Sequence, residues 1–170
     1  VQAVAPEQVE ADVLALPLAS GADGAGAVAK LDASLDGLLA RLAQEGELRD
    51  EIGRAAIVHV DGALAARRVA GAGVGPRERL DADALRTAAA AVAHVAGDFA
   101  ERIAWVIDES LPLPTAEQAR ALVEGTILGG YETARWKRDE EQQKLATLVL
   151  CGDAQGLEEA ASRAATIARW

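Results

Sequence analysis

The sequence predicts an α/β domain with a mostly parallel mixed sheet of about five or six strands, flanked by helices on both faces. Short apolar runs alternate along the chain with longer amphipathic runs, in the order βα, ββα, βα, βα. Strands that are joined through helices of this length pair in parallel and are covered on both sides. The chain has 170 residues, 51% of them hydrophobic, which suits one domain with a buried core. We therefore treat residues 1–170 as a single domain.

The first strand is expected over residues 12–18, where Leu and Val dominate. Pro17 should lie at its end, because proline cannot donate to a sheet ladder. A loop rich in Gly and Ala follows over residues 20–26, and a single helix comes next, with Gly46 as its stop signal. The apolar face of this helix consists of side chains spaced by three and four residues: Val28, Leu31, Leu35, Leu38, Leu39 and Leu42.

Two strands are expected in the middle of the chain, over residues 55–60 and 68–74. The turn dipeptide Asp61-Gly62 follows the first of them, and a glycine-rich corner ending at Pro76 follows the second. A helix should then run to about residue 100. Asp81 or Asp83 is the candidate N-terminal cap of this helix. The side chains expected to face the core are Leu85, Val92, Val95 and Phe99.

Two further strand–helix pairs are expected, with strands over residues 102–107 and 145–151. Thr115 and Gln118 have the spacing of a capping box at the start of the helix between them. The most polar segment, residues 134–144, is interpreted as an exposed loop. The core residues expected on that helix are Leu122, Val123 and Ile127. Asp153 is expected to cap the last helix, whose core residues are Leu157, Ala161, Ala164 and Ile167.

Charge and cysteine content disfavour several classes of partner and compartment. A net charge of −10 repels phosphate backbones and gives no polybasic membrane contact. One cysteine, Cys151, cannot form an internal disulfide, which favours a reducing, cytoplasmic location. No apolar run approaches the ~20 residues that span a bilayer. Because Met is absent and the chain stops within or just after a helix, we expect a domain cut from a longer protein.

The residue types that usually carry chemistry form no recognised pattern. His59 and His94 have no metal-site spacing, and both are interpreted as structural or surface residues. Cys151 ends a predicted strand, where a free cysteine is usually a small buried apolar residue rather than a nucleophile. The serines lie outside any GxSxG context: Ser20, Ser34, Ser110 and Ser162.

Two glycine-rich stretches and several carboxylates lie near predicted strand ends. The stretches 20–26 and 71–75 are placed where a phosphate is often held, but tight corners are the commoner use of such glycines. Glu140 and Glu141 belong to a solvated charged run. The carboxylates at or near strand ends, which border the crevice of open α/β sheets, are Asp12, Asp23, Asp61 and Asp108. Nothing in the sequence brings two of them together, so no catalytic, cofactor-binding or metal-binding residue is assigned.

Three segments taken in order resemble the N-terminal domain of the cytosol (leucyl) aminopeptidase family. The first is the opening strand, residues 11–18, and the second comprises residues 57–62 and 66–73. The third and most specific segment, residues 121–137, is similar to the family pattern E-G-x-x-L-x-x-Y-x-F-x-x-Y/F-K. Its matching positions are Glu124, Gly125, Leu128, Tyr131 and Lys137, whereas Thr133 replaces the usual Phe and Trp136 stands for Tyr or Phe. The likeness extends over about residues 10–170.

The resemblance implies a macrodomain-like fold that precedes a larger catalytic domain absent from this chain. In such a parent, two divalent metals (Mn or Zn) would activate a water for the removal of N-terminal amino acids from peptides. The resemblance also implies contacts with the parent's own catalytic domain and assembly into a homo-hexamer. The family's metal-ligand motif N-T-D-A-E-G-R is absent here, so no catalytic residue is carried over and the fragment itself is expected to be inactive.

Two other functions remain open from the sequence. A stand-alone macrodomain-like module could bind ADP-ribose or a related nucleotide, but its usual Asn-rich turn is replaced here by residues 17–20, Pro-Leu-Ala-Ser. A regulatory or DNA-binding role is disfavoured by the net charge of −10.

Overall fold

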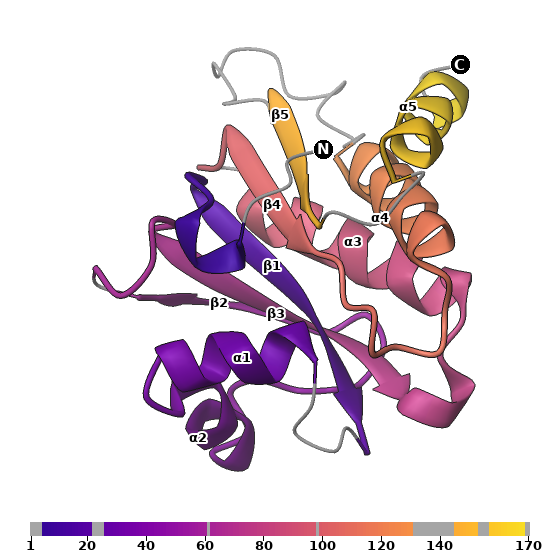
Figure 1. Cartoon of the computed structure of the whole chain (residues 1–170). Coiled ribbons are helices and arrows are strands. Elements are labelled where there is room, and N and C mark those ends of the chain that lie inside the picture. Colours follow the sequence, from indigo (N-terminus) through magenta and orange to yellow (C-terminus); the bar gives the residue numbers. More distant parts are fainter. Residues whose placement is uncertain are drawn as a thin grey trace, which may run out of the picture.

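The computed structural model of the chain describes residues 5–21, 26–60, 62–97, 99–130, 145–152 and 157–168. Within these ranges five strands form one sheet in the order β2-β3-β1-β4-β5 (Figure 1). β2 pairs antiparallel with β3, and every other pair is parallel. The expected α/β class with a mostly parallel mixed sheet is therefore confirmed.

The strands coincide closely with the predicted runs. They are β1 Val13–Ser20, β2 Ala55–His59, β3 Arg68–Pro76, β4 Arg102–Val106 and β5 Thr147–Cys151. The helices and 3-10 turns are η1 Pro6–Gln8, α1 Ala27–Ser34, α2 Leu38–Gln44, η2 Arg77–Arg79, α3 Ala82–Ala96, α4 Thr115–Gly129 and α5 Leu157–Ala168.

Helices cover both faces of the sheet, and alternate residues of each strand supply the two cores. Val13 and Ala15 of β1 face the cluster formed with α3, α4 and α5. Leu14 and Leu16 face the cluster formed with α1 and α2. Figure 1 shows α1 and α2 together on one side of β1, with α3, α4 and α5 on the other. On that second side α4 packs on α3, and α5 packs on α4.

The single helix predicted from residue 28 is two helices, and that prediction was wrong. Asp36 and Gly37 have φ of 52° and 73°, so the backbone leaves the right-handed region between α1 and α2. Asp32 then caps the second helix, because its Oδ1 accepts the backbone N–H groups of Leu39 (2.7 Å) and Ala40 (3.3 Å). The leucine spacing continues across residues 36 and 37, so the sequence pattern gave no sign that the helix is interrupted there.

Pro17 does not end its strand, contrary to the prediction. β1 continues to Ser20 and stays paired with β3 along that length. Its pairing with β4 stops at Ala15, so Pro17 lies where the strand has a partner on one side only. A missing N–H is tolerated in such a one-sided stretch.

Helix α3 begins as expected, since Asp81 Oδ1 accepts the N–H of Ala84 at 2.8 Å. It ends at Ala96, before the predicted residue, and Val95 of its expected core stripe is exposed. Phe99 lies beyond the helix and is partly buried beneath the guanidinium of Arg68.

Helix α4 begins at Thr115 as predicted, and α5 covers the expected core positions from Leu157 onward, but Ile167, expected in that core, is 63% exposed. The glycines of residues 71–75 lie within β3 and not in a corner after it. The predicted roles of Asp61, Asp153 and the polar loop 134–144 fall outside the described residues.

Candidate functional site

A cleft of about 360 Å³ opens at the carboxyl ends of β1, β3 and β4. Ligands of open α/β sheets usually bind at this edge. Apolar and polar side chains share its lining: Pro17, Leu18, Ala19, Ser20, Val28, Ala43, Leu48, Asp50, Arg77, Asp108, Ser110 and Leu111. Of the four carboxylates that the sequence placed near strand ends, Asp108 is the one found here among the described residues.

Asp108 joins the end of β4 to the start of α1. Its carboxylate is buried, with Oδ2 accepting the N–H of Ala27 (3.1 Å) and Oδ1 accepting the N–H of Ser110 (2.9 Å). The chain approaches it closely at Gly26, where φ is +96° and a Cβ would lie 2.6 Å from both carboxylate oxygens. Asp108 therefore occupies the position at a helix N-terminus where an external anion would otherwise bind.

Gln118 fixes the backbone that carries Asp108. Its Nε2 donates to the carbonyls of Asp108 (2.9 Å) and Leu113 (2.8 Å), and its Oε1 accepts the N–H of Asp108 (3.2 Å). The capping box predicted for Thr115 and Gln118 is therefore wrong, because the amide of Gln118 is taken up by this buried loop. The N-cap of α4 is Pro114, and it makes no side-chain cap bond.

The glycine-rich stretch of β3 does not offer free N–H groups to a phosphate. Gly73 N–H donates to the carbonyl of Arg54 (2.8 Å), and Gly75 N–H donates to that of Asp50 (2.7 Å). A Cβ on Gly73 would lie 2.1 Å from the carbonyl oxygen of Glu51, so glycine is needed for the 50–54 segment to pack there. The N–H of Ala27 is likewise taken up, by Asp108. Because these backbone donors are already bonded within the chain, they do not support the nucleotide-binding alternative.

Asp12 and His59, two further candidates from the sequence, make hydrogen bonds that hold parts of the fold together. Asp12 lies at the amino end of β1, where its Oδ2 accepts the N–H groups of Glu101 and Arg102 (both 3.0 Å). His59 is exposed on the edge strand and accepts a hydrogen bond from Arg68 Nε (3.1 Å).

Cys151 is buried, and burial raises the pKa of its thiol to about 11. A thiol with this pKa is protonated at neutral pH and is a poor nucleophile, as the sequence suggested.

Within the described ranges, no group of three or more His, Cys, Asp or Glu side chains is placed to hold a metal ion. No helix of the described part is long and apolar enough to cross a bilayer.

The motif at Glu124-Gly125, which carries much of the family likeness, lies in the contact between α3 and α4. A Cβ on Gly125 would lie 2.1 Å from the carbonyl oxygen of Arg86, and one on Gly129 would lie 2.4 Å from Cα of Ala90. The two glycines, one helical turn apart, let the backbones of the helices approach each other directly. The motif therefore has a packing function that residue types alone did not reveal.

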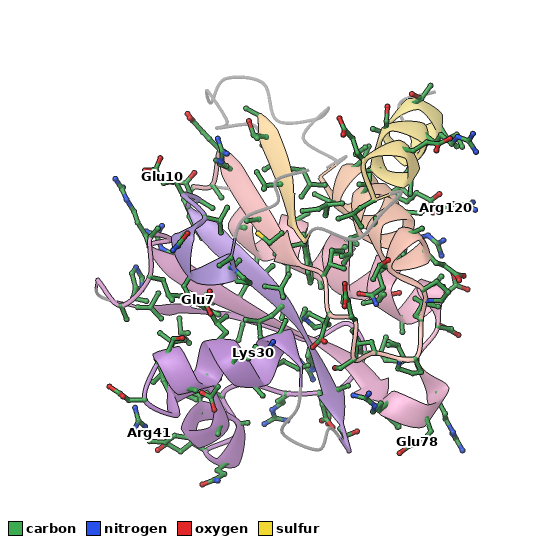
Figure 2. All side chains as sticks on the ribbon, viewed as in Figure 1. Glu7, Glu10, Lys30, Arg41, Glu78 and Arg120 are labelled. Carbon is green, nitrogen blue, oxygen red and sulfur yellow. The ribbon has the colours of Figure 1, made fainter. Side chains whose placement is uncertain are left out.

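Glu124 adds an ion pair to the same contact. Its Oε2 accepts Arg86 Nε (2.9 Å) and its Oε1 accepts Arg120 Nε (2.8 Å). Burial is the largest influence on the pKa of Glu124 and would raise it, but hydrogen bonds from Arg120 and Arg86 outweigh it and lower the pKa. Figure 2 shows Arg120 projecting outward from α4, so it closes the pair from the solvent side.

Comparisons with known proteins agree with the resemblance found in the sequence. A family model described as the cytosol aminopeptidase family, N-terminal domain, matches residues 15–140. The chain is 30% identical over 162 residues to a probable cytosol aminopeptidase of Solibacter usitatus, covering 95% of this chain and 31% of that protein. A protein of the same name from Thermosynechococcus vestitus is 35% identical over 118 residues, covering 68% of this chain and 23% of that protein.

Solved structures show the same fold. A mutant of tomato leucine aminopeptidase superposes with a TM-score of 0.74 at 20% identity, covering 95% of this chain and 34% of that one. The bottromycin maturation enzyme BotP, in complex with Mn, superposes with a TM-score of 0.67 at 22% identity, covering 93% of this chain and 30% of that one. The chain thus spans less than a third of the length of both curated relatives.

Proposed function

Because the chain belongs to the cytosol aminopeptidase family, as its N-terminal domain, we propose that it is the non-catalytic domain of a longer aminopeptidase. The observation that carries the proposal is that the alignment covers nearly all of this chain but only a minor part of the relative. The probable cytosol aminopeptidase of Solibacter usitatus aligns with 95% of this chain but with only 31% of its own length. Most of the enzyme therefore lies outside the segment that this chain represents.

In this proposal the parent removes N-terminal amino acids from peptides in the cytoplasm, using two divalent metals, Mn or Zn, in its C-terminal domain. Support for a metal comes from BotP, a structural neighbour that was solved in complex with Mn. The described residues of this chain do not fit that role, since they bring together no metal-binding group. The metals are accordingly assigned to the missing domain, and no chemical step is assigned to this one.

The role proposed for this domain is structural, in packing against its own catalytic domain and in assembly of a homo-hexamer. The close α3–α4 contact supports such a role, because two helices packed at backbone distance present a continuous outer surface. Peptides are proposed as substrates of the parent and not as ligands of this chain.

The mass of the native protein is the first test. An antibody raised against this chain should detect a band far heavier than 17.6 kDa in the source cell. A band at 17.6 kDa would mean a stand-alone module and would overturn the proposal.

Activity assays then separate the roles of the two parts. With Mn or Zn present, the full-length parent should release leucine from leucyl peptides, whereas the 170-residue chain should release none under the same conditions. The molar mass of the parent, measured by light scattering with and without this domain, tests assembly. A hexamer that persists after deletion of the domain would contradict the assembly role and leave the catalytic assignment intact.

A further inference from the structure

The cleft at the carboxyl ends of the strands contains two opposite charges that are not paired with each other. Arg77 and Asp50 both line it, and no ion pair joins them. Within the described ranges, no hydrogen bond engages the carboxylate of Asp50, although its carbonyl is held by Gly75 N–H. Both side chains are only partly exposed, so neither is simply a solvated surface charge.

Arg77 has donors left for a ligand. One of its terminal nitrogens donates to the carbonyl of Ser110, which positions the guanidinium against the loop after β4. A guanidinium has five N–H donors in a fixed fork, and a carboxylate matches that fork better than any neutral group does.

The remaining walls decide the size and polarity of the ligand. Leu18, Val28 and Leu48 give the cleft an apolar wall, and its volume of about 360 Å³ lies near the lower limit for small-molecule sites. A phosphate would find the N–H groups of Ala27, Gly73 and Gly75 already bonded within the chain. It would also meet the carboxylates of Asp50 and Asp108 in the lining.

We propose that this cleft binds a small zwitterion with the chemistry of a free α-amino acid bearing an apolar side chain. The carboxylate of the ligand bonds Arg77, its ammonium group bonds Asp50, and its side chain contacts the apolar wall. A ligand that carries both charges pairs two groups that the fold leaves unpaired, which neither a simple anion nor a simple amine does.

This inference goes beyond the proposed function, because no step of peptide hydrolysis is involved. The proposed parent releases this class of molecule, but binding is measured on the 170-residue chain alone. Failure of either proposal therefore leaves the other to be judged by its own experiment.

The test is a titration of the ¹⁵N-labelled chain with L-leucine, followed by NMR. A ligand this small is expected to bind with a dissociation constant of about 1 mM or tighter. Amide shifts should map to Leu18, Leu48, Asp50 and Arg77. The absence of shifts at the cleft up to about 20 mM leucine, well above that constant, would overturn the proposal.

Ligands that lack one charge sharpen the test. 4-Methylpentanoate lacks the ammonium group and isoamylamine lacks the carboxylate, so each should bind at least about tenfold more weakly than leucine. Equal binding of either compound would contradict recognition of the zwitterion. Tighter binding of ADP-ribose than of leucine in the same cleft would identify a nucleotide site instead and would also overturn the proposal.

The variant Asp50→Asn tests the ammonium contact without removing a structural hydrogen bond of that side chain. It should weaken leucine binding at least about fivefold and leave 4-methylpentanoate binding unchanged. Glu78→Gln is the matched control, since Glu78 projects outward from η2 and does not line the cleft (Figure 2). Unchanged leucine affinity in Asp50→Asn, with its spectrum otherwise intact, would refute the assignment.

Discussion

The two faces of the sheet are closed by different physical means. On the face covered by α3 and α4, the helices meet through Gly125 and Gly129, and backbone atoms set the distance between them. On the face covered by α1 and α2, two short helices are held at their ends by the carboxylates of Asp108 and Asp32. Added side-chain volume should therefore destabilise the first face, whereas loss of a hydrogen-bond acceptor should destabilise the second.

The largest effect is expected for Gly125→Ala on the α3–α4 face. The added Cβ would lie 2.1 Å from the carbonyl oxygen of Arg86, so the helices must separate, and we expect a loss of about 3 kcal/mol or more in the free energy of unfolding. Urea denaturation measures it. Gly130→Ala, at the end of the same helix with φ of −77°, is the control and should cost less than about 1 kcal/mol. Equal costs for the two variants would contradict the volume limit.

Asp108→Ala should have the next largest effect and tests the other face. It leaves the N–H groups of Ala27 and Ser110 without their acceptor, at a cost of about 2 kcal/mol. Asp108→Asn keeps one acceptor oxygen and should lose roughly half as much. Hydrogen exchange should accelerate at Ala27 in the alanine variant. If exchange there stays as slow as in the wild type, Asp108 does not cap α1.

Glu124→Gln removes the charge from the α3–α4 contact without changing its volume. We expect a loss of about 1–2 kcal/mol at neutral pH, reduced from the fully buried case because the partner arginines are partly exposed. The pKa of Glu124 is lowered in the folded state, so its stabilisation is complete above the unfolded value of about 4.3 and is lost as the pH falls through the folded value.

Denaturation curves at several pH values check this sign. The gap between wild type and Glu124→Gln should be constant above about pH 5 and should close in acid. A gap that does not change with pH would show that the carboxylate contributes through shape and not through charge.

The smallest effect is expected for Asp32→Ala on the α1–α2 face. The substitution removes the cap of α2 and should cost about 1 kcal/mol. Asp36→Gly is the contrasting variant: Asp36 has φ of 52°, a conformation that glycine adopts without strain, so no loss is expected. Thermal unfolding of both variants distinguishes the contribution of the cap from that of the turn. A loss of stability in Asp36→Gly alone would show that the turn, and not the Asp32 cap, stabilises this part of the fold.

Local signals predicted most of the fold. Each strand was marked by its own apolar run. The cap of α3 was narrowed to Asp81 or Asp83, because capping depends on neighbours a few residues away, and the structure selects Asp81. The break at Asp36-Gly37 was missed because the leucine spacing continues across it. The capping box at Thr115 was wrong because Gln118 bonds a loop whose position depends on the whole fold.

The site was less predictable, because its contacts join distant parts of the chain. Asp108 was singled out as a strand-end carboxylate, but its bond to Ala27 spans 81 positions and has no local signature. Asp50 and Arg77 were not recognised at all, since nothing near them in the sequence indicates a shared cleft. The Glu124-Gly125 motif was recognised by resemblance, and its packing role became visible only with α3 in place.

The central position of β1 has a consequence for synthesis on the ribosome. Leu14 pairs with Val69 on one side and with Ala104 on the other, so β1, the first of these strands along the chain, gains its second neighbour only when β4 has been made. At roughly 5–20 residues per second, several seconds separate its emergence from that of β4. During this interval Leu14 and Leu16 have no complete sheet to join, and the nascent chain should be a client for chaperones until residue 106 has left the tunnel.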